Sequence, residues 1–183
     1  MTDFLQTHPD GVVLAVDQMS LYFQATMTRV WAPRGQTPTL RVATQREWAH
    51  FYGALNVITG HEIAETMSGQ NGELTVQFVQ HLQNCYPGRA LLILWDRAQW
   101  HRGAIVRRFL EQQPLIETLH FPPGSPQFNP QEHVWGRTRA AVSHNHTHQD
   151  FAGLVQAFEQ HLTQTRFQFD WIERFAPPIL YEV

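Results

Sequence analysis

Several features that are scarce in this 183-residue sequence limit what it can be. Its single cysteine, Cys85, has no partner for an internal disulfide, and we predict that it is a small packed side chain. The longest apolar runs span about six residues, far fewer than the roughly 20 that a membrane-spanning helix needs. The first residues also lack the basic and apolar segments of a secretory signal. These absences predict a cytoplasmic protein without a membrane segment.

Basic residues are few as well. The chain has 13 Lys and Arg against 16 Asp and Glu, which gives a formal net charge of −3. Because contacts with phosphate depend on basic side chains, this charge argues against tight independent binding to nucleic acid. Apolar residues are plentiful by comparison, at 43% of the chain, which is enough for one globular domain with a proper core.

Residues 121–135 change abruptly from a loop rich in proline and glycine to a run that favours a helix. Asn129 is a good N-cap, Pro130 suits the first helical position, and Glu132 then falls in the first turn. Taken alone, a Glu three residues after an N-cap is more often half of a capping box than a catalytic group. The stretch therefore predicts where Glu132 lies but leaves its role open.

Two apolar runs lie upstream, at residues 12–16 and 90–95. An aspartate follows each of them directly, Asp17 after the first and Asp96 after the second. Neither run alternates with polar residues, which is typical of central strands covered on both faces. An ionised Asp at the end of a buried strand is costly unless something binds it. Together with Glu132, the two aspartates form the ligand set of a two-metal site for phosphoryl transfer, and such oxygen ligands favour Mg²⁺ or Mn²⁺.

The order of elements indicates how the strands are arranged. Residues 21–24 and 29–31 are predicted to pair across a turn and residues 48–58 to add a strand, so that the first part forms an antiparallel meander. Helices are predicted at 73–85 and 102–113, with a further strand at 115–121. A right-handed crossover makes the strand before Asp96 parallel to the strand before Asp17, so both aspartates emerge at one sheet edge if the strands are neighbours.

Roughly residues 10 to 165 resemble the catalytic domain of mariner-superfamily DDE transposases, particularly the bacterial insertion-sequence branch. The most specific element is the proline-rich loop that ends in Asn-Pro-x-Glu-x-x-Trp. The family usually has Glu after the first aspartate and Asn after the second, where this chain has Gln18 and Arg97. The blocks that carry the resemblance are Ala15-Val-Asp17, Trp31-Ala-Pro-Arg-Gly-Gln36, Gly53-Ala-Leu-Asn56, Leu94-Trp-Asp96 with His101, and Pro122 to Trp135.

The resemblance implies a ribonuclease H-like α/β fold, which the element order also fits: a mixed five-stranded sheet with flanking helices. It implies DNA cleavage and strand transfer, with Asp17, Asp96 and Glu132 as catalytic residues and as ligands of two Mg²⁺ or Mn²⁺ ions. The partners would be transposon ends and target DNA, with TA as the family's target. We expect a homodimer at the bacterial nucleoid, and a separate helix-turn-helix region because this chain lacks the family's N-terminal DNA-reading modules.

Residues 1–10 are predicted to be a tail or linker remnant and residues 11–166 the catalytic domain. The aromatic segment 167–183 is predicted to pack on the domain or on a partner subunit.

Three residues are candidates for DNA contact, each with an ordinary alternative. Arg34 lies in a predicted surface loop and competes with a solvated arginine. His101, five residues after Asp96, could orient a water or phosphate or could simply bond to backbone at a helix start. Arg139, two turns after Glu132 on the same helical face, could hold a phosphate or be solvated.

Other interpretations remain open at this point. The histidines of residues 143–149 are interpreted as an ordinary connection between helices, since the run lacks the cysteines of a structural zinc site. A ribonuclease or resolvase of the same fold would share the carboxylates but not the proline-rich block. A non-catalytic remnant acting as an interaction module would fit the changes at Gln18 and Arg97, but the intact carboxylates argue against it.

Overall fold

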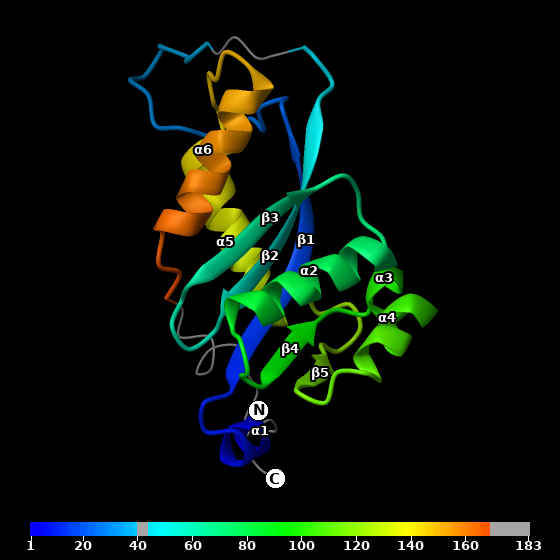
Figure 1. Cartoon of the computed structure of the whole chain (residues 1–183). Coiled ribbons are helices and arrows are strands. Elements are labelled where there is room, and N and C mark those ends of the chain that lie inside the picture. The colour runs from blue at the N-terminus through cyan, green and yellow to red at the C-terminus, as the bar shows by residue number, and fades with distance from the viewer. Residues whose placement is uncertain (40–43, 169–183) are drawn as a thin grey trace.

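The structure is a computed structural model that describes residues 1–39 and 44–168 (Figure 1). Its centre is a mixed five-stranded sheet, as the sequence predicts, and the strand order is β3-β2-β1-β4-β5. The strands are β1 (Val12–Tyr22), β2 (Trp48–Asn56), β3 (Glu62–Met67), β4 (Leu91–Trp95) and β5 (Ile116–His120). β1 is antiparallel to β2 and parallel to β4, which follows from a hairpin-type meander and then a helical crossover.

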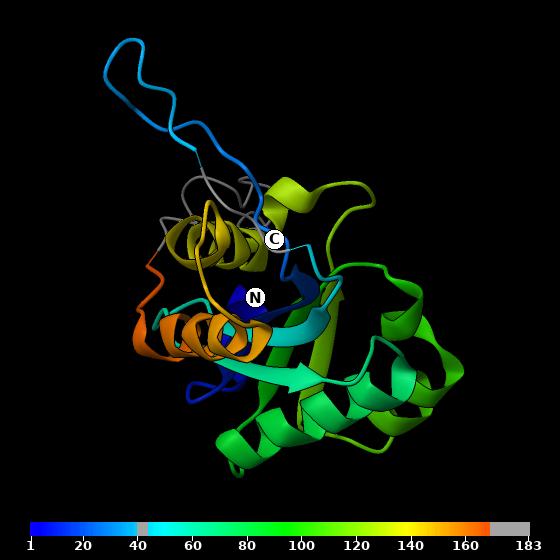
Figure 2. The ribbon, with the colours of Figure 1, turned by 90° about the horizontal axis from the view of Figure 1, so that it is seen from above.

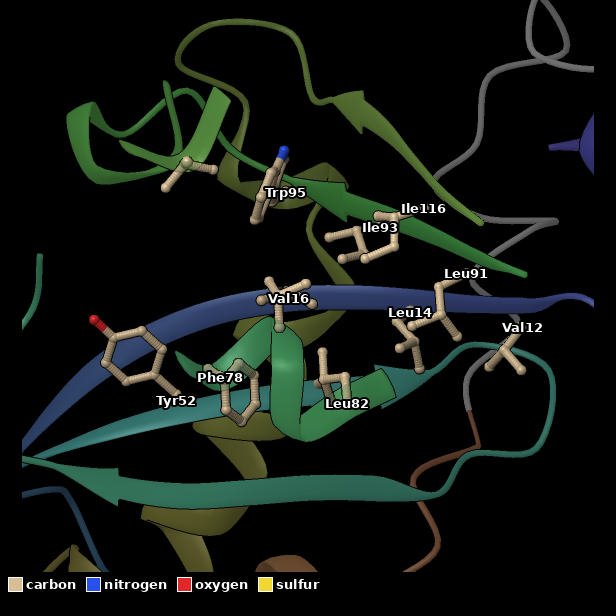
Figure 3. Close-up of a cluster of buried hydrophobic side chains, with 13 residues drawn as sticks. Val12, Leu14, Val16, Tyr52, Phe78, Leu82, Leu91, Ile93, Trp95 and Ile116 are labelled. Atoms are coloured by element: carbon tan, nitrogen blue, oxygen red, sulfur yellow. The ribbon is translucent and has the colours of Figure 1, made fainter. Parts of the chain in front are cut away.

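Helices cover both faces of the sheet (Figures 1 and 2). The helices are α1 (Thr2–Thr7), α2 (Gly72–Cys85), α3 (Gln99–Arg102), α4 (Ala104–Leu110), α5 (Pro130–Thr138) and α6 (Phe151–Gln164). Phe78 and Leu82 of α2 and Val106 of α4 pack with β-strand residues in one apolar cluster (Figure 3). Trp135 of α5 and Phe158 of α6 pack in a second cluster on the opposite face. No helix in the described part of the chain is long and apolar enough to cross a membrane.

The meander differs from the prediction in its strands. Residues 29–31 are not in a strand, and Trp31 is fully exposed. β1 instead continues unbroken to Tyr22 and pairs with β2, and the third strand of the meander is β3, which the sequence analysis did not identify. The predicted pairing of 21–24 with 29–31 is therefore wrong. Residues 24–39 form an arm that extends away from the body of the domain (Figure 2).

Two local predictions also need correction. The helix expected at 102–113 is shorter, since α4 covers only Ala104–Leu110, and Gly103, which is extended with ψ near 158°, separates it from the short helix α3 that precedes it. Cys85 is exposed rather than packed, and its Sγ lies 3.5 Å from His81 Nε2.

The N-terminal residues do not form a free tail. Residues 2–7 make α1, and the Phe4 ring is buried against Leu92 and Leu94 of β4 and Val13 of β1. At the other end, Phe167 is buried and its N–H donates to Gly60 O. Residues 169–183, which hold most of the predicted aromatic segment, lie outside the described residues.

Candidate active site

The register of the two central parallel strands brings the aspartates level with each other. Ala15 of β1 pairs with Leu94 of β4, and each aspartate lies two residues further along its chain. Since side chains alternate along a strand, Asp17 and Asp96 follow the side-chain direction of this pair, toward the α5 face of the sheet. The sequence predicts Asp17 at the end of its strand, but the structure places it inside β1. It lies just beyond the level at which the neighbouring strand β4 ends.

The start of α5 places Glu132 beside the aspartates. Asn129 is the N-cap as predicted, and its Oδ1 accepts from the Gln131 N–H at 3.1 Å. The Asn129 N–H, which a capping box would direct to Glu132, instead donates to Pro126 O at 2.9 Å. Glu132 therefore does not serve the capping box, and its side chain lines a pocket.

One pocket of about 390 Å³ collects all three carboxylates. Its wall is the loop rich in proline and glycine, and Arg97 lies at the same pocket as the only cationic side chain among its lining residues. The lining residues are Asp17, Asp96, Arg97, Ala98, Phe121, Pro122, Pro123, Gly124, Ser125, Pro126, Asn129 and Glu132. Residues far apart in the sequence thus converge at the sheet edge that the sequence predicted.

The pKa of Asp17 depends more on its burial than on the neighbouring carboxylates. Burial, with smaller contributions from the charges of Glu132 and Asp96, raises the pKa of Asp17 to about 7. The Gln18 N–H and the Trp135 side chain oppose this shift, although Trp135 Nε1 makes no hydrogen bond of ordinary geometry. Near neutral pH the pocket therefore gains from any cation that offsets its negative charge.

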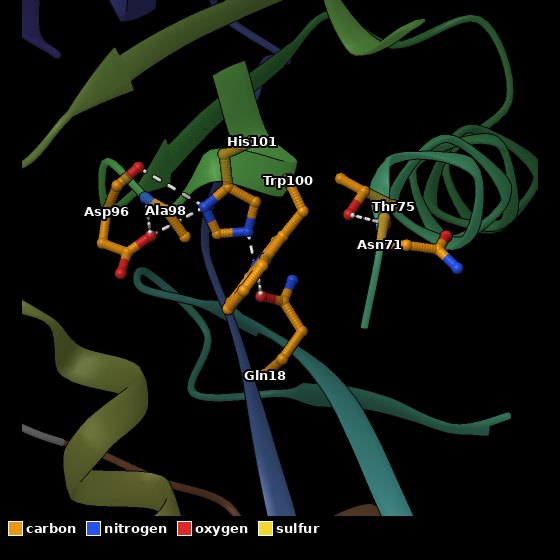
Figure 4. A network of polar contacts seen from close by, with 7 residues as sticks. All are labelled: Gln18, Asn71, Thr75, Asp96, Ala98, Trp100 and His101. Atoms are coloured by element: carbon orange, nitrogen blue, oxygen red, sulfur yellow. Dashed lines mark hydrogen bonds and ion pairs between the residues drawn. The ribbon is translucent and has the colours of Figure 1, made fainter. Parts of the chain in front are cut away.

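Asp96 is held by a network that reaches β1 (Figure 4). Its Oδ1 accepts from the Ala98 N–H at 2.9 Å and lies 2.8 Å from His101 Nδ1. The hydrogen bond from His101 is the main reason that the pKa of Asp96 is lowered. On its other side, His101 Nε2 lies 2.9 Å from Gln18 Oε1, which also accepts from Trp100 Nε1 at 2.7 Å.

Trp100 settles the direction of these hydrogen bonds. An indole N–H can only donate, so the Gln18 atom that it meets is the amide oxygen. His101 Nε2 faces the same oxygen, which can accept from it. His101 thus links Asp96 to Gln18, and its hydrogen bond lowers the pKa of Asp96, with Gln18 supplying the acceptor at the position where the family usually has Glu.

The structure separates the three predicted DNA contacts. The His101 side chain is completely buried and stacks on Trp95 with ring centroids 4.7 Å apart, so in this structure it contacts Asp96 and is not exposed for contact with DNA. Arg139 begins a π-helical turn (Arg139–Ser143), about 10 Å along the axis from Glu132, and does not line the pocket. Arg34 is exposed on the arm.

The carboxylate oxygens of Asp17, Asp96 and Glu132 are ligands of the kind that hard divalent cations prefer. In the described part of the chain, however, no three His, Cys, Asp or Glu side chains lie close enough together to hold a metal ion. The Asp96 side chain is half exposed, and Glu132 is exposed. The bond with His101 engages only Oδ1 of Asp96, so Oδ2 is the oxygen left for another ligand.

The histidine run has a structural role. His146 is buried, its Nε2 donates to Phe23 O at 2.8 Å, and its Nδ1 accepts from the His148 N–H at 3.3 Å. Both ring nitrogens of His146 are therefore engaged. The neighbouring Asn145 side chain bonds to the Thr28 backbone. The run thus fixes the base of the arm, which agrees with its interpretation as an ordinary connection.

Two residues of the site had no functional signal in the sequence beyond their positions. Gln18 and Arg97 follow the two aspartates and stood out only as departures from the family pattern. The structure gives Gln18 the acceptor role described above and places Arg97 at the pocket. Only their adjacency to Asp17 and Asp96 could have suggested either role.

Comparison with known proteins identifies the chain's relatives. The profile of the family described as DDE superfamily endonuclease matches residues 12–155. The Mos1 transposase paired-end complex with left transposon end has a TM-score of 0.73 at 16% identity, over 98% of this chain and 58% of that chain. The catalytic domain of Mos1 mariner transposase has a TM-score of 0.61 at 12% identity, over 93% of this chain and 78% of that chain. No curated protein matches the sequence.

At these identities the structural likeness establishes the fold, which is ribonuclease H-like as the sequence analysis predicted. The chain spans a little over half the length of the Mos1 transposase in the paired-end complex, at 58%. The family match covers most of the chain, from the start of β1 into α6, and includes all three carboxylates. This chain belongs to the DDE superfamily endonucleases.

Proposed function

We propose that this chain is the catalytic domain of a mariner-like transposase, which cleaves DNA at transposon ends and joins the freed 3′ end to target DNA. The observation that carries the proposal is the alignment of Asp17 and Asp96 on neighbouring parallel strands, with Glu132 at the same pocket. Family membership and the titles of the matching Mos1 structures, which name transposon ends and strand transfer, support it.

The proposal includes dependence on divalent metal, with two Mg²⁺ or Mn²⁺ ions held by Asp17, Asp96 and Glu132. Mos1 complexes with Mn and with Mg support the choice of ions. Such ions, when bound, supply the positive charge that stabilises the attacking and leaving oxygens of a phosphodiester. The raised pKa of Asp17 is consistent with a site whose negative charge awaits a cation.

The chain's own residues would prepare the site. His101 fixes one oxygen of Asp96 and leaves the other for binding. Arg97, at the pocket, is placed to attract a DNA phosphate that the carboxylates would otherwise repel. The proline-rich loop, by restricting backbone freedom, keeps the pocket wall in place before DNA arrives. No covalent intermediate with a protein nucleophile is required.

DNA recognition would depend on more than this domain. The net charge of −3 limits phosphate contacts, so we propose that a helix-turn-helix region, in the same protein or a separate chain, reads the transposon ends. Arg34 and Arg139 would then add phosphate contacts, and TA would be the target dinucleotide. The protein would act in the cytoplasm at the bacterial nucleoid, as an enzyme of the insertion-sequence branch.

The arm supports a homodimer. Met27, Val30 and Trp31 have exposed fractions of 61%, 58% and 104%, and all three belong to the arm, which extends from the domain in Figure 2. Large apolar side chains in such a position are typical of a protein interface, with tryptophan as an anchor. A second copy of this chain is the proposed partner.

A cleavage assay in single metals tests the proposal. The substrate is a duplex that carries a transposon end, with a DNA-reading module supplied, and Mg²⁺, Mn²⁺ and Ca²⁺ are compared. We expect cleavage in Mg²⁺ and Mn²⁺, and binding without cleavage in Ca²⁺, whose larger radius disturbs the alignment. Activity in excess chelator would overturn the metal mechanism. Cleavage without strand joining would favour a nuclease or resolvase, and metal binding without cleavage would favour a non-catalytic remnant.

A further inference from the structure

A second carboxyl group is buried behind the active site. Glu62, the first residue of β3, is 1% exposed and does not line the pocket. Its Oε1 accepts from Gln131 Nε2 at 2.6 Å. Burial raises the pKa of Glu62 well above its ordinary value, and this bond with Gln131 opposes the shift only in part. Glu62 is therefore a hydrogen-bonding group within the core rather than a further charge of the pocket.

The space that this hydrogen bond occupies exists because residue 53 is glycine. A Cβ at position 53 would lie 2.4 Å from Gln131 Nε2, 2.4 Å from the Trp135 ring and 2.5 Å from Glu62 Oε1. Gly53 is also the β2 partner of Asp17. The sheet thus has a gap directly beside the catalytic aspartate, and two α5 side chains and Glu62 fill it.

Gln131 connects this contact to the active site because Glu132 is the next residue. The Gln131 N–H is bonded to the N-cap Asn129, and its side chain is completely buried against Glu62. Successive residues of a helix point about 100° apart, so an inward Gln131 turns Glu132 toward the helix side that faces the pocket. Gln131 is therefore one of the buried α5 side chains, with Val134 and Trp135, on which the rotation of the helix about its axis depends.

We propose that Glu62 and Gln131 are positioning residues: their buried hydrogen bond over Gly53 fixes the rotation of α5 and thereby the place of the Glu132 carboxylate opposite Asp17. The inference rests on the proposed function of the same pocket. It explains why a polar pair lies beside the apolar cluster of the α5 face, where Gln131 Oε1 is left without a hydrogen bond. A pair of apolar side chains would avoid the cost of a buried polar atom without a hydrogen bond. It would not hold α5 in one orientation, because apolar contacts lack the directionality of a hydrogen bond.

The test compares matched variants of the whole chain by the nicking of supercoiled plasmid in Mn²⁺ and by Mn²⁺ binding in a calorimeter. Gly53→Ala is expected to lower kcat about 10–100-fold, the range for residues that orient metal ligands. Gly136→Ala is the control, because it lies in the same helix and its added Cβ would meet nothing within 4 Å. Wild-type activity in Gly53→Ala would overturn the inference.

Variants of the pair separate positioning from packing. Glu62→Gln keeps an acceptor for Gln131 and is expected to retain the wild-type rate within about twofold, whereas Glu62→Ala loses it. Gln131→Met keeps the length of the side chain without the hydrogen bond, and is expected to fold and to lower kcat about tenfold with KM for DNA unchanged. A purely structural role would instead lower the melting temperature of Gln131→Met and leave kcat per folded molecule unchanged.

Failure of this inference is distinguishable from failure of the proposed function. If the wild type neither binds Mn²⁺ nor nicks DNA, the proposed function fails. In that case the inference is tested by comparing the position of the Glu132 carboxylate in crystal structures of Gln131→Met and Gly136→Ala. A Glu132 carboxylate that stays in place in Gln131→Met overturns the positioning role, and one that turns away only in that variant supports it.

Discussion

The two faces of the sheet are covered by helices of similar length but of different chemistry. On the α2 side, the cluster in Figure 3 is apolar, and Tyr52 directs its hydroxyl to the Asn71 N–H at the rim. On the α5 side, an apolar cluster of the same size surrounds buried polar residues, among them Glu62, Gln131 and Thr138. The three carboxylates of the pocket, which we propose to be catalytic, lie at the edge of this second face.

This difference indicates how the domain divides its tasks. The apolar cluster on the α2 face stabilises the fold mainly by burial, at about 25 cal/mol for each Å² removed from water, although His101 and Thr75 are buried polar residues on this side too. The α5 face gives up part of that gain, because carboxylates and amides that lose water must be satisfied by specific partners. We infer that the α2 face contributes mainly to the stability of the fold. The polar contacts of the α5 face set the orientation of side chains at the pocket.

The largest effect that follows from this division is on activity. We expect at least about a 1,000-fold reduction of DNA cleavage, or roughly 4 kcal/mol of activation free energy, in each of Asp17→Asn, Asp96→Asn and Glu132→Gln. Each substitution removes a metal-binding charge and leaves the shape of the side chain nearly unchanged. In chelator, their melting temperatures should equal or exceed that of the wild type. Glu73→Gln, at an exposed carboxylate of α2, is the control and should cleave normally. Unfolding of all three variants would show that the carboxylates support the fold instead.

The pH dependence of stability should follow Asp17. In the folded protein Asp17 holds its proton up to about pH 7, whereas in the unfolded chain it releases the proton near pH 3.8. The folded state binds more protons in this window, so the free energy of unfolding should fall as pH rises from about 4 to about 7, by at most about 4 kcal/mol. Denaturant titrations in chelator at pH 5 and pH 8 measure the fall. Asp17→Asn should remove most of it, and an equal slope in that variant would contradict the assignment.

Truncation of the α2 face should lower stability without affecting chemistry. Leu82 is completely buried, and Leu82→Ala is expected to lower the free energy of unfolding by about 3 kcal/mol through lost burial and a cavity. The rate of cleavage per folded molecule should not change. Ile105→Ala, at a side chain 46% exposed, is the control and should cost less than about 0.5 kcal/mol. A changed kcat in Leu82→Ala would break the separation of the two faces.

The smallest expected effect concerns Arg34 on the arm, which neither face supports. If Arg34 contacts one phosphate, Arg34→Ala should reduce the slope of log Kobs against log salt concentration by about 0.9 and weaken binding similarly for all DNA sequences. Binding titrations between low and moderate salt measure this slope. Arg107→Ala, at an exposed arginine of α4, serves as the comparison. Equal slopes for the two variants would leave Arg34 as a solvated arginine.

Local signals in the sequence were sufficient for much of the fold and for the three carboxylates. Apolar runs without alternation predicted β1 and β4, and Asn129 with Pro130 predicted the start of α5. These predictions succeed because strand burial, capping and the restriction of φ by proline act over a few residues. The meander failed for the opposite reason. Whether residues 29–31 or residues 62–67 pair beside β2 depends on which segment buries its side chains against α5 and α6, a distant contact.

By itself, the sequence determined the family, the parallel direction of the strands before Asp17 and Asp96, and the choice of Asp17, Asp96 and Glu132 as candidates, since each depends on a local pattern or a rule of strand connection. The tertiary structure decided what those residues touch. Register alone sets Asp17 level with Asp96, and the buried position of His101 turns it from a DNA contact into a support for Asp96. The contact of Glu62 with Gln131 over Gly53 joins residues 69 positions apart. No local pattern encodes such contacts, because they exist only where the folded chain removes water from all of their partners at once.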